Sequence, residues 1–89
     1  MQYNDYIVAS GQGAKKAFLK AMEIESSDPE SHFIGVKRYF IVNTQSFETV
    51  NYALEWLDDA DLSHIKFKNN TAGALIINSD TYLFFAISK

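Results

Sequence analysis

The spacing of the hydrophobic residues changes repeatedly along this chain, between the spacing of a strand and that of a helix. A short apolar run at 6–9 is typical of a strand. It is followed by apolar residues at helical spacing, which are Ala14, Ala17, Phe18, Ala21 and Met22. The pattern therefore predicts a strand that ends near Ser10 and a helix from about Gly13 to Ile24.

The middle of the chain repeats this change of spacing. The segment 32–43 is rich in β-branched and aromatic residues, which predicts one long strand. A second helical stripe follows, formed by Phe47, Val50, Leu54 and Leu57. We expect Thr44 or Ser46 to cap this helix, since hydroxyl side chains bond the free amides of a first turn. The helix is expected to end near Ala60.

Three further segments, at 64–69, 74–78 and 82–88, have the pattern of strands. Consecutive strands with short connections favour an antiparallel meander. The expected order is β-α-β-α-β-β-β, and the expected fold is α+β, with two helices packed on one face of a mainly antiparallel sheet. The other face would then expose aromatic side chains, so a structural homodimer subunit is one alternative function.

The length and composition indicate a single compact domain over residues 1–89. Hydrophobic residues make up 47% of the chain and charged residues 21%, which is typical of a globular domain. The chain has no cysteine, which excludes disulfides and thiolate chemistry and favours a reducing compartment. No apolar run is long enough to span a bilayer. We therefore expect a cytoplasmic protein without a membrane partner.

The stretch "ASGQGAKKA", residues 9–17, places two glycines and two lysines at the expected start of the first helix. Backbone amides at a helix start attract anions, so an anion- or nucleotide-binding domain is another alternative function. Its site would be formed by Ser10, Gly11, Gly13, Lys15 and Lys16. The stretch matches neither a Walker loop nor a dinucleotide fingerprint, and a flexible turn before a solvated helix explains the same residues.

Other chemical motifs are missing or partial. His32 and His64 are the only histidines, and neither metal-ligand spacing nor a nucleophile elbow accompanies them. We expect no metal, no cofactor and no enzymatic activity. The stretch "VKRYFIVN", residues 36–43, resembles the basic and aromatic strand of RNA-recognition modules but lacks their glycine and small residues. The net charge of −3 argues against direct nucleic-acid binding.

Acidic residues gather at the end of the second predicted helix. The stretch "EWLDDAD" contains Glu55, Trp56, Asp58, Asp59 and Asp61. Negative charge at a helix C-terminus opposes the helix dipole, and carboxylates four residues apart repel each other. A tryptophan among acids is typical of an interface for a partner with a basic surface. A solvated helix end, with the tryptophan at the edge of the core, explains the same pattern.

These features favour a non-enzymatic protein-binding module. A short, acidic, cysteine-free α+β chain without a catalytic motif is similar in size, charge and missing chemistry to phage-encoded anti-defence inhibitors, such as anti-CRISPR proteins. That similarity implies a viral protein that inhibits its partner by occupying a basic surface of the kind that holds nucleic acid. It assigns no role to any individual residue.

Overall fold

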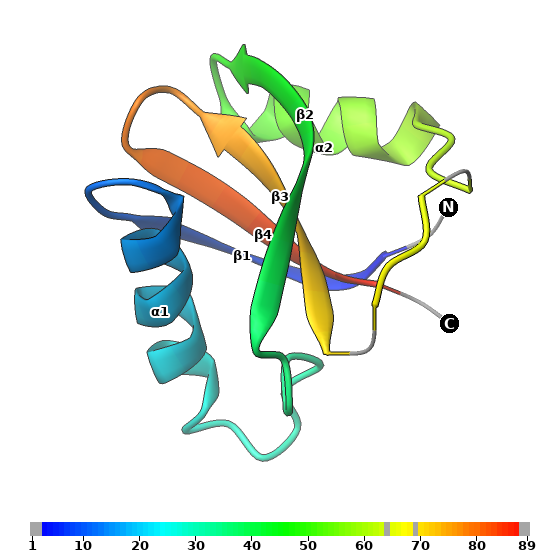
Figure 1. Cartoon of the computed structure of the whole chain (residues 1–89). Helices are drawn as coiled ribbons and strands as arrows, with labels where there is room; N and C mark the ends of the chain where they lie inside the picture. Colours follow the sequence, from blue (N-terminus) through cyan, green and yellow to red (C-terminus); the bar gives the residue numbers. More distant parts are fainter. Residues whose placement is uncertain (1–2, 64, 69, 88–89) are drawn as a thin grey trace.

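The computed structural model describes residues 3–63, 65–68 and 70–87, which form two helices and one four-stranded sheet (Figure 1). The elements are β1 (Tyr3–Ser10), α1 (Ala14–Glu25), β2 (Arg38–Phe47), α2 (Val50–Asp59), β3 (Thr71–Ile77) and β4 (Thr81–Ile87). The order across the sheet is β1-β4-β3-β2, so β1 and β2 are the edge strands. β4 is antiparallel to both of its neighbours, and β2 is parallel to β3. The α+β class and the mainly antiparallel sheet are confirmed.

The two helices pack on opposite faces of the sheet, so the expectation that they share one face is wrong. Neighbouring residues of a strand point to opposite faces. On β4, Phe84 packs in the core under α1, and Phe85 packs in the core under α2. Both side chains are fully buried. A sheet whose central strands are apolar on both faces needs a cover on both sides. The last strand is therefore covered within one chain, which removes the sequence-based reason for a homodimer.

The described residues form four strands, because the expected strand at 64–69 is not part of the sheet. Residues 65–68 are irregular, and His64 and Asn69 lie outside the described residues. Ile65 packs at the edge of the core under α2, and its amide donates to the carbonyl of Leu62 at 3.0 Å. The alternation of apolar and basic residues here thus reflects a segment with one packed side rather than a paired strand.

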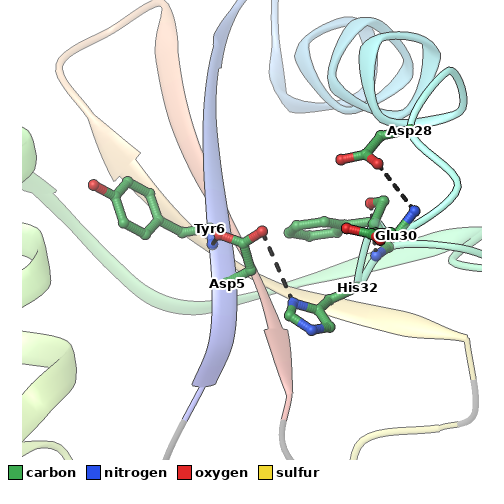
Figure 2. Close-up of polar contacts among 7 residues, drawn as sticks. Asp5, Tyr6, Asp28, Glu30 and His32 are labelled. Carbon is green, nitrogen blue, oxygen red and sulfur yellow. Dashed lines mark hydrogen bonds and ion pairs between the residues drawn. The ribbon is translucent and has the colours of Figure 1, made fainter.

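The connection between α1 and β2 is held by short-range polar contacts (Figure 2). The Asp28 carboxylate accepts a hydrogen bond from the Glu30 amide at 2.9 Å. The His32 Nδ1 atom lies 3.9 Å from the carboxylate of Asp5 on β1. Phe33 is buried in the core under α1. This connection therefore contributes to the core, although most of it is exposed.

The strand β2 begins and ends later than the sequence pattern predicts. It starts at Arg38 instead of His32, because residues 32–35 form a turn. Gly35 has a φ of 82°, which a residue without a Cβ adopts at little cost. At the other end β2 continues to Phe47, which the hydrophobic spacing assigns to the second helix.

Thr49 is the residue that caps α2. Its Oγ1 atom accepts a hydrogen bond from the Tyr52 amide at 3.2 Å, whereas the expected caps, Thr44 and Ser46, lie on β2. We expect Thr49→Ala to lower the free energy of unfolding by about 1 kcal/mol, because one amide of the first turn loses its partner. This corresponds to a fall in Tm of roughly 4–8 °C for a domain of this size.

Chemical and thermal unfolding of Thr49→Ala and of Ser46→Ala would check this assignment. Ser46 is an exposed hydroxyl on β2, so its removal should change the free energy of unfolding by less than about 0.5 kcal/mol. Equal losses in the two variants would contradict the cap at Thr49.

Candidate binding surfaces

The end of α2 carries an exposed group of carboxylates. Glu55, Asp58 and Asp59 are all exposed, and α2 has no basic residue in its last turn. Within the described ranges these three side chains form no ion pair. Their negative charge is therefore not neutralised by a neighbouring lysine or arginine there. Together with Trp56 and Asp61 they form what we call the acidic surface.

Asp61 has a structural role in the turn that follows α2. Its carboxylate accepts hydrogen bonds from the Ser63 amide at 3.0 Å and from the Ser63 hydroxyl at 2.6 Å. A short acidic side chain that bonds the backbone two residues ahead is a common way to hold a turn. The presence of Asp61 in the acidic stretch is thus explained by local structure.

Trp56 is half-buried beside the carboxylates. Its ring centroid lies 5.8 Å from that of Phe47 on β2, and it packs at the edge of the core under α2. Trp56 thus packs at the edge of the core, as one of the two sequence-based interpretations predicts. Trp56 is only partly buried, and Asp59, three residues further along α2, is its neighbour on the helix surface.

Tyr3 on β1 is close enough to Asp58 to sense its negative charge. Partial burial raises the pKa of the Tyr3 hydroxyl above its usual value, and the Asp58 carboxylate raises that pKa further. The ring of Tyr3 packs edge-to-face on Phe85, with 6.4 Å between the centroids. Sequence reasoning missed this residue because Tyr3 and Asp58 are far apart in the chain and interact only in the folded protein.

The two glycines of the proposed anion turn have structural reasons of their own. The Gly11 amide donates to the carbonyl of Asp80 at 2.9 Å, and a Cβ on Gly11 would lie 2.8 Å from the Ala17 backbone nitrogen. Gly13 has a φ of 95° immediately before α1. A close approach and a left-handed conformation both favour glycine.

Other residues of this turn bond within the chain. The Ser10 and Thr81 hydroxyls lie 3.0 Å apart, and the Lys16 ammonium donates to the Gln12 side chain at 3.4 Å. A shallow hollow here, of about 410 Å³, includes Asp80 in its lining. Asp80 adds a negative charge beside this hollow, which disfavours an anion there. The five residues thus lie together at the start of α1, but the structure adds nothing that favours a bound phosphate.

A groove of about 560 Å³ lies between the start of β2 and the segment 65–68. We call it the basic-aromatic groove; it is lined by Arg38, Tyr39, Phe40, Ile65, Lys66, Phe67, Lys68 and Thr71. The rings of Phe40 and Phe67 meet edge-to-face, with 6.1 Å between the centroids. The sequence pattern indicates only the β2 side of this groove, because the alternation at 64–69 predicts a further strand of the sheet.

Comparisons with known proteins assign no function to these surfaces. No protein-family model, curated protein or solved structure matches the chain. Among the residues that the structure describes, no three histidine, cysteine or acidic side chains lie close enough together to hold a metal ion. Neither helix within those residues combines the length and hydrophobicity needed to cross a membrane.

Proposed function

We propose that this chain is a non-enzymatic binding module that contacts a basic surface of a protein partner through its acidic surface. The supporting observation is the exposed group of Glu55, Asp58 and Asp59 at the C-terminal end of α2, without an ion-pair partner in the described part of the chain. Asp58 and Asp59 lie in the last turn and oppose the helix dipole, and a charge at that place typically costs about 0.3–1 kcal/mol. A cationic partner would offset this cost on binding.

Trp56 supplies the apolar part of the proposed interface. Its contact with Phe47 holds the ring in place before binding, so little side-chain entropy would be lost in a complex. Tryptophans at the centre of an interface often contribute much of the binding energy, and surrounding charges raise the association rate with an oppositely charged partner. The acidic surface combines both elements.

The finer proposal is inhibition of the phage anti-defence type. An acidic module that covers a basic, nucleic-acid-type surface would prevent that surface from holding its nucleic acid. This part of the proposal rests on the small size, the net charge of −3 and the lack of catalytic motifs. It predicts a partner that binds nucleic acid and whose binding to this chain weakens as salt is added.

The test is affinity capture with the tagged chain in a lysate of its native host, at about 50 and 500 mM salt, where screening differs strongly. Asp58→Lys combined with Asp59→Lys should abolish capture of the partner. The same double variant should unfold at an unchanged or higher temperature, because lysines at a helix C-terminus favour the dipole.

The matched control is Glu23→Lys combined with Glu30→Lys. It makes the same change in net charge at two exposed residues, one on α1 and one in the connection that follows it. The control should still capture the partner, although more weakly, because the changed net charge reduces long-range attraction. Equal capture by the Asp58/Asp59 double variant and the unmodified chain would overturn the proposal, and so would equal losses in the two double variants.

A further inference from the structure

The positive charge of this acidic chain is concentrated around the start of β2. Arg38, Lys66 and Lys68 line the basic-aromatic groove. Arg38 also lines a second hollow, between α1 and the start of β2, together with Lys15 and Lys37. These are five of the eight lysine and arginine residues of the chain, and neither lining contains an acidic side chain. Positive charge gathered in a concave surface attracts an anionic ligand even when the net charge is negative.

The lining of the groove is aromatic as well as basic. Phe40 is 48% exposed, and the Phe67 ring stands at 90° to it. A hollow lined by both cations and an exposed ring suits a ligand that carries negative charge and a flat, weakly polar face. Nucleotides have this combination, since bases stack on aromatic side chains and phosphates pair with lysine or arginine. An acidic peptide supplies the charge but need not supply the flat face.

We propose that the basic-aromatic groove binds a single strand of nucleic acid. One base packs against Phe40 and Phe67, and the phosphates on either side pair with Arg38, Lys66 and Lys68. The groove volume of about 560 Å³ suits a ligand of nucleotide size. β2 is an edge strand, so the bound nucleic acid can continue past the sheet edge toward Lys37, which immediately precedes β2.

This proposal goes beyond the protein-binding function, because it uses a different set of residues. The acidic surface lies on α2 and in the turn that follows it, whereas the groove is lined by the start of β2, the segment 65–68 and Thr71 of β3. The expectation against nucleic-acid binding rested on the net charge, which averages over both surfaces. The two proposals therefore fail or hold independently.

Binding is measured by fluorescence anisotropy with labelled 12-residue oligothymidine and oligouridine at about 50 mM salt. Three cations that pair with phosphates predict a slope of about −2 when the logarithm of the affinity is plotted against the logarithm of the salt concentration.

Phe40→Ala should weaken binding roughly 5- to 150-fold, which is the range for one stacked base. Lys66→Glu combined with Lys68→Glu should abolish it. Circular dichroism checks that each variant is folded. If Phe40→Ala does not fold, Phe40→Leu replaces it, because this change removes the ring but keeps the apolar bulk.

The matched control is Lys16→Glu combined with Lys20→Glu. It changes the net charge equally at two exposed residues of α1 that line neither hollow. This control should bind clearly better than the Lys66/Lys68 double variant, and equal losses would overturn the proposal. It would also be overturned by equal binding of an abasic 12-residue sugar-phosphate chain, by equal competition from an oligoglutamate peptide, or by no binding of either oligonucleotide at about 100 μM protein.

Discussion

Gly73→Ala is expected to lower the free energy of unfolding by about 3 kcal/mol or more, which is the upper end of the usual cost of overpacking a core. Gly73 lies on β3, directly opposite Phe85 on β4. The Phe85 ring occupies the space above this glycine, so that an added Cβ would lie 2.0 Å from the nearest ring carbon. Two non-bonded heavy atoms cannot lie so close, so the Phe85 ring or one of the two strands would have to shift.

The ring of Phe85 has little room to move away. Its side chain is fully buried and packs in the core under α2, together with Leu57 and Leu83. A domain of this length has a total stability of about 4–13 kcal/mol, so the loss would take a large part of it. We expect Gly73→Ala to be partly unfolded at physiological temperature.

Denaturant unfolding of a double-mutant cycle tests the origin of this effect. Phe85→Leu alone should also destabilise the protein, but the double variant Gly73→Ala, Phe85→Leu should lose less than the sum of the two. Gly35→Ala is a useful reference, because it changes a glycine with positive φ whose nearest outside atom would be 3.8 Å away. It should cost only about 1 kcal/mol. Additive losses in the cycle would show that the Phe85 ring does not cover Gly73.

Phe84→Ala is expected to be the second severe change, with a loss of about 3–5 kcal/mol. Phe84 is fully buried at the centre of the core under α1. Its ring centroid lies 5.4 Å from that of Phe18 and 5.9 Å from that of Tyr39, both in edge-to-face geometry. Removal of the ring would leave a cavity between α1 and the sheet and would break both aromatic contacts.

The same substitution at Phe40 provides the control. Phe40 is 48% exposed, so Phe40→Ala should cost less than about 1 kcal/mol, although it is expected to weaken binding in the basic-aromatic groove. Thermal unfolding and near-ultraviolet circular dichroism would compare the two variants. A loss of less than 1 kcal/mol for Phe84→Ala would mean that the core under α1 is not packed around this ring.

The type of most elements could be predicted from the sequence. The first helix was expected from about Gly13 to Ile24 and spans Ala14–Glu25. The last strand is predicted at 82–88 and is described as Thr81–Ile87, with residue 88 outside the described residues. These predictions succeed because hydrophobic spacing is a local property, and both elements have one apolar pattern over their whole length.

The failures occur where one local pattern is compatible with two packing arrangements. Phe47 continues the apolar spacing of α2, yet it pairs with Ile77 across the sheet as the last residue of β2. Residues 65–68 alternate like a strand, but they line a groove beside β2 instead of pairing. For the candidate sites, the carboxylates of the acidic surface could be predicted from their neighbourhood in sequence, whereas the interaction of Tyr3 with Asp58 could not.

The amino-acid sequence by itself determined the α+β class, the approximate positions of both helices, and the acidic stretch that ends α2. Only the tertiary structure decided that the helices cover opposite faces and that Phe40 meets Phe67 in a groove among cations. The physical reason is the distance along the chain over which each feature is decided. Helix and strand patterns depend on neighbours a few residues apart, but the partners of a surface or a core depend on strand order and register, which arise from contacts between segments that are distant in the chain.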